Sequence, residues 1–321
     1  VADGHSGGQA GLVADIETGQ GRRSLSGHAQ GQCHGKKEAG ATHCDSGLAR
    51  NRFFVNGPVL YCNAMTHPAF QIVPARAPTP LLLLCDHAAN ALPPAYGGQG
   101  GNQEGALGLD PALFQTHIAW DIGAAQVTRA LAAAYGAAAV LGRWSRLLID
   151  LNRGEGDPTL VMKLSDGIII AGNRDADAHE VARRIAAFHA PYHGEIARQA
   201  ARIEGFAVPV LISLHSFTPS WKGKPRPWQV GVLYDRDTRL AAPLMTRLAQ
   251  AGFVVGDNEP YRGALDGDTL NTHGTRMGRP HVLIEMRQDL VADAEMAAAF
   301  ALRLKPVLDA ALQDMQAANG R

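Results

Sequence analysis

Apolar residues recur along this chain in two patterns, as short continuous runs and as longer stretches at helical spacing. The continuous runs, rich in Leu, Val and Ile, predict buried strands at residues 80–85, 138–141, 147–151, 208–214, 230–234 and 281–284. The helically spaced stretches predict helices at residues 121–135, 178–203, 240–251 and 293–315. Strands that alternate with helices predict a single α/β domain in three layers, with a mainly parallel, mixed sheet covered by helices on both faces.

The first 64 residues differ from the rest of the chain. They are rich in Gly, Ser, Gln, His and Arg and show neither helical nor strand periodicity. We therefore interpret residues 1–64 as a disordered or artefactual N-terminal extension, with Met65 as the natural start and residues 65–321 as the folded domain. A genuine disordered tail is the alternative interpretation.

Composition narrows the class of partner. The chain has 30 basic and 30 acidic residues among 321, so its overall charge favours neither nucleic acid nor an anionic membrane. No apolar run approaches the roughly 20 residues needed to span a bilayer, and no basic segment followed by an apolar one opens the chain. We expect a cytoplasmic protein whose partner is a small molecule.

The four cysteines do not indicate a disulfide framework. Cys85 lies in an apolar run and is expected to be a buried thiol, whereas Cys33, Cys44 and Cys62 lie in the N-terminal segment. The pairs Cys33-His34 and His43-Cys44 offer a weak zinc-binding alternative, because paired Cys-x-x-Cys spacing is missing.

Three of the predicted strands carry reactive side chains to their carboxyl ends. The 80–85 run leads into Asp86-His87, the 208–214 run into His215, and the 281–284 run into Glu285. Ligands of open α/β sheets bind in the crevice beyond the carboxyl ends of the strands. Two histidines and a carboxylate at one such edge indicate a metal-dependent hydrolytic site.

Catalytic zinc sites usually have three protein ligands and one water, whose pKa falls to about 7 on the metal. His87 and His215 are two candidates, and Asp121 is preferred as the third over Asp86 and Asn90. The alternatives are a helix N-cap role for Asp121 and histidines that hydrogen-bond to neighbouring backbone. Zinc is the expected metal, and another divalent transition metal also suits mixed His and carboxylate ligands.

Glu285 suits a general base that takes a proton from water and passes it to the leaving amine. A structural ion pair between Glu285 and Arg287 is the alternative. Asn152 and Arg153 follow the 147–151 run, and an arginine grips a carboxylate through two parallel hydrogen bonds, so the substrate is expected to carry a carboxylate. The alternative is that Arg153 is a solvent-exposed loop residue that binds no substrate.

Other polar segments complete the predicted site. Residues 271–276 are interpreted as a Gly-containing loop suited to substrate contacts or a mobile lid, and residues 219–227 as a loop near the site. His179, His189 and His193 fall in a helical stretch and are interpreted as surface or packing residues. The predicted substrate-binding residues are Asn90, Arg143, Asn152, Arg153, Ser216, His273, Arg276 and Arg287.

Four motifs together make the chain resemble the N-formylglutamate amidohydrolase family from about residue 81 to the C-terminus: Asp86-His87-Ala88-Ala89-Asn90, Ser213-Leu214-His215-Ser216-Phe217, Asn271-Thr272-His273-Gly274 and Ile284-Glu285-Met286-Arg287. The resemblance implies a phosphorylase/hydrolase-like fold related to carboxypeptidases, aspartoacylase and zinc muramoyl-alanine amidases, with residues 65–321 as the amidohydrolase domain.

The resemblance also implies roles for individual residues. His87 and His215 match the two metal histidines of this wider group, Glu285 matches its catalytic glutamate, and residues 150–153 resemble its Asn-Arg element for a substrate carboxylate. Asp121 matches the acidic ligand of the muramoyl amidases. Carboxypeptidases and aspartoacylase instead use His-x-x-Glu, and the corresponding position here is Asn90.

The resemblance implies zinc-dependent hydrolysis of an N-acyl amino acid, most simply N-formyl-L-glutamate to L-glutamate and formate. Two alternatives remain open at this point. One is a metal-dependent amidase for another N-acyl amino acid or peptide, and the other is a metal-free carboxylate-binding protein with the same fold.

Overall fold

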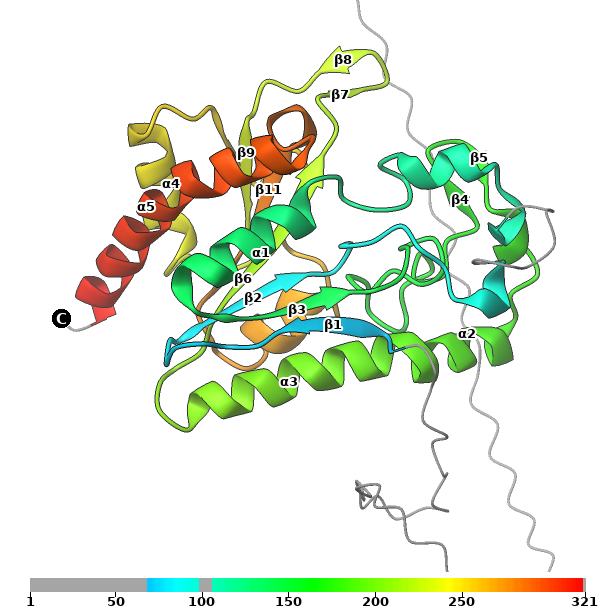
Figure 1. Ribbon diagram of the computed structural model, residues 1–321, viewed down its shortest axis with the longest axis horizontal. Coiled ribbons are helices and arrows are strands. Elements are labelled where there is room, and N and C mark those ends of the chain that lie inside the picture. The colour runs from blue at the N-terminus through cyan, green and yellow to red at the C-terminus, as the bar shows by residue number, and fades with distance from the viewer. Residues whose placement is uncertain (1–67, 98–105, 320–321) are drawn as a thin grey trace, which may run out of the picture. The chain divides into compact units, whose positions relative to one another are not determined.

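The computed structural model describes residues 68–97 and 106–319. Their main element is a seven-stranded sheet with the order β1-β3-β2-β6-β11-β9-β10 (Figure 1). The strands are β1 (Phe70–Val73), β2 (Leu81–Cys85), β3 (Ala138–Gly142), β6 (Val210–Phe217), β9 (Val230–Leu233), β10 (Val255–Asp257) and β11 (His281–Arg287). Neighbours run parallel except at the β1–β3 and β9–β11 pairs. The predicted mixed, mainly parallel sheet is confirmed.

Helices cover both faces of the sheet (Figure 1). One face packs against α1 (Ala124–Tyr135), α4 (Ala241–Gln250) and α5 (Ala294–Asn319). The other face packs against α3 (Ala190–Glu204), which continues α2 (Ala178–Arg184) through a π-helical turn at Ile185–His189. These helices correspond to the four predicted helical stretches, so the three-layer α/β arrangement is confirmed.

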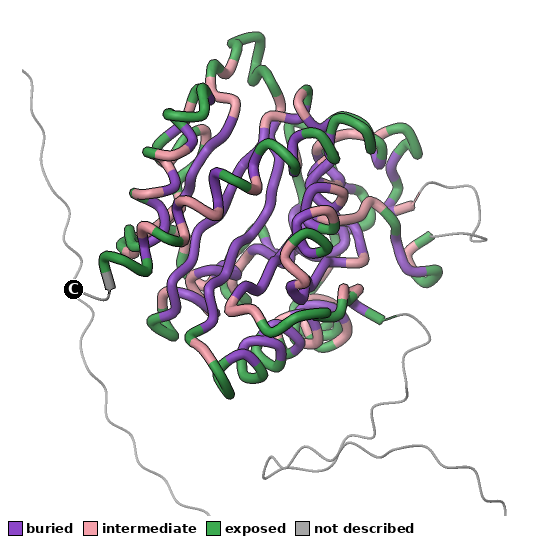
Figure 2. The backbone as a smooth tube through the Cα atoms, turned by 60° about the vertical axis from the view of Figure 1, so that its left-hand side comes forward, coloured by how far each residue is buried: buried purple, intermediate pink, exposed green. Residues whose placement is uncertain are grey.

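The β2 strand shows why its sequence is a continuous apolar run. Successive side chains of a strand point to opposite faces, and here Leu81, Leu83 and Cys85 enter one core while Leu82 and Leu84 enter the other. A strand covered on both faces has no polar side, and Figure 2 shows the central strands buried along most of their length.

Short elements fill the connections. They are the hairpins β4 (Leu164–Ser165) with β5 (Ile168–Ile169) and β7 (Ser220–Trp221) with β8 (Lys224–Pro225), the 3-10 helices Pro94–Tyr96, Ala106–Gly108, Pro111–Gln115, Ala171–Asn173 and Gln288–Leu290, and the π-helical turn Asn271–Thr275. None of the helices in the described residues is long and apolar enough to cross a membrane.

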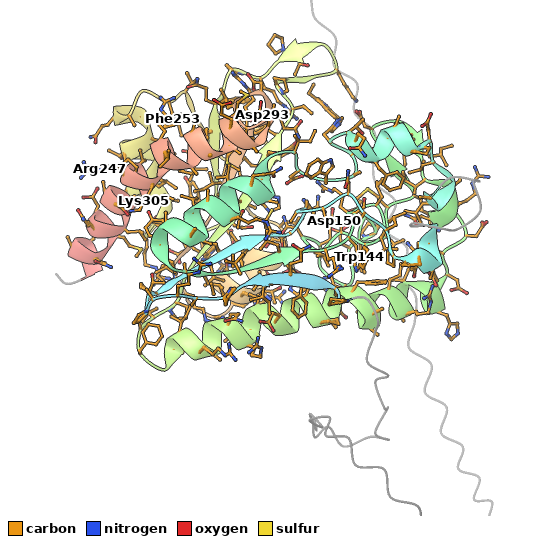
Figure 3. The ribbon with its side chains drawn as sticks, viewed as in Figure 1. Trp144, Asp150, Arg247, Phe253, Asp293 and Lys305 are labelled. Carbon is orange, nitrogen blue, oxygen red and sulfur yellow. The ribbon has the colours of Figure 1, made fainter. Side chains whose placement is uncertain are left out.

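The predicted strand at residues 147–151 is wrong. These residues are buried, but they form turns, because their backbone groups bond to other partners than a neighbouring strand. The carbonyl of Leu147 accepts from the Asn173 side chain and that of Leu148 from Arg184, both 2.7–2.8 Å away. Buried polar side chains thus satisfy this stretch, and Figure 3 shows Asp150 in the loop region beyond the ends of β2 and β3.

Two further predictions need correction. The helix predicted from residue 121 begins at Ala124, and the N-cap position belongs to Gly123, whose φ is 82°. The 271–276 segment was predicted to be a loop, but Asn271–Thr275 forms a π-helical turn in which His273 and Gly274 are buried. The boundary at residue 65 and the cysteines at 33, 44 and 62 lie outside the described residues.

Candidate active site

The three strand ends meet as the sequence predicted. His215 lies near the carboxyl end of β6, and Glu285 is its partner in the parallel register with β11. His87 is the second residue after β2, and its backbone carbonyl accepts a hydrogen bond from the backbone N–H of Asp121 at 3.0 Å. That bond brings the segment before α1 to the same edge, so His87, Asp121, His215 and Glu285 share one pocket of about 300 Å³.

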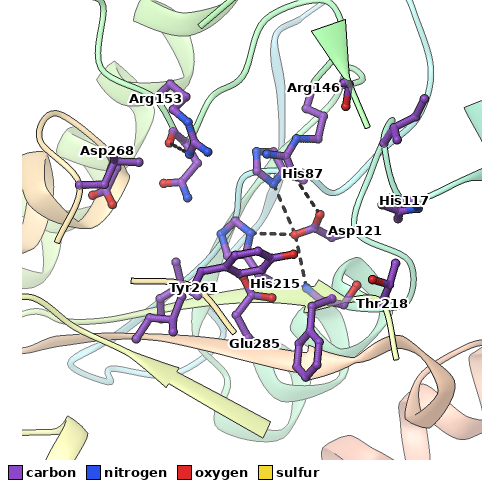
Figure 4. A pocket seen from close by; sticks show the side chains of 18 of the residues that line it. His87, His117, Asp121, Arg146, Arg153, His215, Thr218, Tyr261, Asp268 and Glu285 are labelled. Carbon is purple, nitrogen blue, oxygen red and sulfur yellow. Dashed lines mark hydrogen bonds and ion pairs between the residues drawn. The ribbon is translucent and has the colours of Figure 1, made fainter. Parts of the chain in front are cut away.

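Two histidines and one aspartate converge inside this pocket (Figure 4). Oδ2 of Asp121 lies 2.8 Å from Nδ1 of His215 and 3.4 Å from Nδ1 of His87. All three residues are buried, and one ligand atom from each lies within 4.8 Å of the others. Asp121 does not cap α1, so its carboxylate is free to take part in this cluster. The donor set of two imidazoles and one carboxylate fits a divalent transition metal with an open coordination position.

The Nε2 atom of each histidine, on the side of the ring away from the cluster, contacts a further buried carboxylate. Nε2 of His87 lies 2.7 Å from Oδ1 of Asp150, and Nε2 of His215 lies 2.9 Å from Oδ2 of Asp86. A carboxylate accepts, so each Nε2 donates its proton to that partner, and Nδ1 is the nitrogen of each ring that faces the cluster. Asp86 therefore orients His215 and does not join the three ligand atoms.

The charges in this network are strongly coupled. Burial alone would raise the pKa of the Asp86 and Asp150 carboxyls, but the histidines, and Arg146 beside Asp150, hold both well below the usual range. Burial alone would lower the pKa of His215, but the hydrogen bonds and charges of Asp121 and Asp86 raise it well above its usual value. These buried carboxylates therefore favour a cation between them.

Arg146 is a site residue that the sequence analysis missed. Its Nη2 lies 2.7 Å from Oδ2 of Asp150, and its Nη1 lies 3.5 Å from Oδ1 of Asp121. The guanidinium therefore links the carboxylate behind His87 to the carboxylate in the cluster. The available signal was the i, i+4 spacing of Arg146 and Asp150, which was obscured when residues 147–151 were interpreted as a strand.

Glu285 faces the cluster without a partner of its own. Its Oε2 is buried and has no hydrogen-bond partner among the described residues. Burial raises the pKa of Glu285 to about 7, and the charge of Asp121 acts in the same direction. The alternative ion pair with Arg287 does not form, because Arg287 pairs with Asp289 at 2.7 Å. A buried carboxylate with an unused oxygen beside the cluster has the position of a proton acceptor.

Asn152, Arg153 and Ser216 line the pocket, as predicted for substrate-binding residues. Nη1 of Arg153 donates to the Asn152 carbonyl at 2.8 Å and its Nε donates to Thr159 Oγ1 at 3.2 Å, which fixes the direction of the guanidinium. The amide oxygen of Asn152 accepts from the backbone of Thr269 at 3.2 Å. Ser216 Oγ donates to the Ile122 carbonyl at 2.7 Å.

The other five predicted substrate-binding residues lie outside the lining of this pocket. Each has another contact: Asn90 donates to the Phe114 carbonyl, Arg143 stacks on Trp144, His273 bonds to His193, Arg276 pairs with Asp266, and Arg287 pairs with Asp289. The lining contains Trp221, from the 219–227 loop that was predicted to lie near the site, and also Tyr261, Arg262 and Asp268, which the sequence analysis did not select as site residues.

Three histidines support the Asp150–Arg153 segment from the side of α3. His189 Nε2 lies 2.9 Å from the Arg153 carbonyl, and His193 Nε2 lies 3.0 Å from the Leu151 carbonyl. Because a carbonyl only accepts, His193 is protonated on Nε2, and its Nδ1 accepts from Nε2 of His273 at 2.9 Å. The packing role predicted for His189 and His193 is confirmed, and their contacts hold the backbone that carries Arg153.

Comparison with known proteins gives matches that cover most of the described chain. A family model described as N-formylglutamate amidohydrolase matches residues 79–292. A crystal structure of a gene product from Agrobacterium tumefaciens is 34% identical, with a TM-score of 0.72, and the match covers 78% of this chain and 97% of that one. An N-formylglutamate amidohydrolase structure from Ralstonia eutropha JMP134 is 19% identical, with a TM-score of 0.55 and coverage of 79% and 100%. No curated protein matches the chain.

Proposed function

Because the chain belongs to the N-formylglutamate amidohydrolase family, we propose that it hydrolyses N-formyl-L-glutamate to L-glutamate and formate with the help of a bound divalent metal, preferably zinc. The observation that carries this proposal is the cluster of His87, Asp121 and His215 with the unpartnered Glu285 oxygen beside it. The expected cytoplasmic location stays a prediction.

The proposed metal ligands are Nδ1 of His87, Nδ1 of His215 and a carboxylate oxygen of Asp121. A metal bound by these residues would act as a Lewis acid, which would polarise the formyl carbonyl and make water more acidic. Asp150 and Asp86 keep both histidines in the tautomer that presents Nδ1, and such carboxylate partners also raise the basicity of the imidazole.

Glu285 is the proposed general base. Its carboxylate accepts one proton from the attacking water while the water oxygen bonds to the formyl carbon. The same carboxyl then delivers that proton to the amide nitrogen as the carbon–nitrogen bond breaks, so the free amine of glutamate leaves together with formic acid, which releases its remaining proton to solvent and becomes formate. Its position suits Glu285 to both steps, because a buried carboxylate with an unused oxygen beside the cluster can take a proton from water and return it.

Arg153 is the proposed anchor for the α-carboxylate of the substrate. Its bonds to Thr159 and the Asn152 carbonyl use part of the guanidinium and fix its direction before the substrate arrives. A pre-oriented guanidinium loses less side-chain freedom on binding than a mobile one. The anchor thereby sets where the scissile amide lies relative to Glu285.

Release of formate from N-formyl-L-glutamate by the purified protein tests the proposal. We expect activity that disappears on chelation and returns when zinc is restored. N-acetyl-L-aspartate and an N-formyl dipeptide, assayed in parallel, distinguish this substrate from the other amides. A protein that binds metal and releases no formate contradicts the proposed substrate, and a protein that binds no metal contradicts the proposed chemistry.

A further inference from the structure

One wall of the pocket is a short turn at residues 258–263, after β10. Asn258 holds it from inside, because its Oδ1 accepts from the backbone of Gly263 at 2.9 Å and from that of Tyr234 at 3.1 Å. The backbone N–H of Asn258 donates to the Val232 carbonyl at 3.0 Å. The turn is therefore attached by hydrogen bonds to the carboxyl end of β9.

Two glycines allow the turn to lie this close to the sheet. A Cβ at Gly263 would lie 2.2 Å from the Tyr234 nitrogen, and a Cβ at Gly231 would lie 2.1 Å from the Glu259 carbonyl oxygen. Both distances are well inside van der Waals contact, so any larger residue would push the turn away. Gly231 and Gly263 therefore allow the turn to lie against the sheet at the pocket wall.

The turn presents Tyr261 and Arg262 to the pocket. Figure 4 shows the Tyr261 side chain in the pocket with His215, Asp121 and Glu285. Arg226 donates to the same hydroxyl at 3.4 Å and stacks on its ring. Arg262, the next residue, is exposed and has no hydrogen bond or ion pair with any described residue.

The three arginines that line the pocket differ in what they contact. Arg146 is bound to Asp150 and Asp121, and Arg153 is directed by Thr159 and the Asn152 carbonyl. Only Arg262, among the described lining arginines, leaves its whole guanidinium without a protein partner. The turn is held in place by the hydrogen bonds of Asn258, and it places the unpaired guanidinium of Arg262 at the pocket wall. A guanidinium in this position can bind an anion.

We propose that Arg262 binds the distal, side-chain carboxylate of the substrate and is the residue that selects an acidic amino acid. The assignment rests on the proposed function, in which Arg153 takes the α-carboxylate. A dicarboxylate needs a second cation, and Arg143, Arg276 and Arg287 are outside the pocket lining. Since Arg262 is exposed, its attraction for the carboxylate weakens as salt is added.

Kinetics with a matched pair of substrates test the assignment. N-formyl-L-glutamate and N-formyl-L-glutamine have nearly the same shape and differ in the distal charge. In Arg262→Gln, we expect KM for N-formyl-L-glutamate to rise roughly 10- to 100-fold, while kcat and both constants for N-formyl-L-glutamine stay within about two-fold. Arg236→Gln is the control, because Arg236 is also exposed and, among the described residues, pairs with Asp235 alone. An equal change for both substrates, or no change, overturns the assignment.

Calorimetric binding of the free amino acids gives a second readout that does not depend on turnover. Wild-type protein loaded with zinc should bind L-glutamate more tightly than L-glutamine, and Arg262→Gln should lose that preference. If the wild type releases no formate from either formyl substrate, the proposed function fails, yet this binding preference still decides the role of Arg262. Equal binding of the two amino acids by the wild type, or no binding of either, overturns that role.

Discussion

Oδ1 of Asp150 lies 2.7 Å from Nε2 of His87, and both side chains are buried. The carboxylate therefore fixes which ring nitrogen of His87 carries the proton and which one faces the cluster. The same contact recurs between Asp86 and His215 at 2.9 Å, so both proposed ligands are oriented in the same manner.

Asp150→Asn is expected to weaken metal binding about 10- to 100-fold, because an amide no longer enforces the tautomer that presents Nδ1. Competition with a chromophoric chelator measures the change. Asp157→Asn is the matched control, since Asp157 lies in the same segment and bonds to the backbone and side chain of Thr159. Unchanged affinity in a folded Asp150→Asn protein would show that the carboxylate does not support the metal site.

Glu285 links the stability of the metal-free protein to pH. Its pKa is raised from 4.5 to about 7 in the folded state, so the folded state holds the proton more tightly than the unfolded chain. The resulting stabilisation is full below pH 4.5 and is lost as pH rises through 7. Relative to wild type, Glu285→Gln should therefore gain unfolding free energy between pH 5 and pH 8, by at most roughly 3 kcal/mol.

Urea unfolding of both proteins at a series of pH values, in the presence of chelator, measures this linkage. Zinc serves as the control, because a nearby dication lowers the pKa of a carboxyl and should remove most of the pH-dependent difference. A difference between the two metal-free proteins that stays constant from pH 5 to pH 8 would contradict the buried, unpaired state of Glu285.

His193 makes the free energy of unfolding depend on pH in the direction opposite to Glu285. Burial lowers its pKa to about 3, and burial also lowers the pKa of its partner His273 to about 4, so both are neutral when folded. The unfolded chain takes up protons near pH 6.5, so this contribution to stability is lost as pH falls from there towards 4. His193→Gln should be less stable than wild type by about 1–2 kcal/mol at pH 7.5, with a smaller deficit at pH 5.5.

Unfolding midpoints of metal-free wild type and His193→Gln at the two pH values test this expectation. His179→Gln is the control from the same helical stretch, because His179 is exposed. A deficit for His193→Gln that grows at pH 5.5 would mean that His193 is charged in the folded protein.

The parts of the fold that the sequence predicted have one physical origin. Strands buried on both faces read as continuous apolar runs, which is why β2, β3, β6, β9 and β11 were found. The edge strands β1 and β10 are short and partly exposed, so they carry no such run. Residues 147–151 show the converse error, because a buried loop whose carbonyls bond to Asn173 and Arg184 has the same apolar composition as a strand.

The site residues also divide into those that the strand pattern predicted and those that it could not predict. His87, His215 and Glu285 stand at or near the ends of central strands, and the parallel register alone brings them to one edge. The roles of Asp86 and Asp150 depend on which ring nitrogen each one meets, and no sequence pattern specifies that. Arg287 was a misleading candidate, although Asp289 two residues later was a signal that it is paired.

Arg262 could not be found from local sequence, because its position depends on segments far apart in the chain. Asn258, Gly231 and the backbone of Tyr234 together place the turn that carries it. Such contacts between separate strands become visible only in the folded structure.

Metal content measured together with formate release in Glu285→Gln separates the residue proposed to move the proton from the residues proposed to hold the metal. We expect the variant to keep one zinc per chain and wild-type KM for N-formyl-L-glutamate, while kcat falls roughly 100- to 10,000-fold. A variant that retains zinc and near-wild-type kcat would mean instead that another group carries the proton.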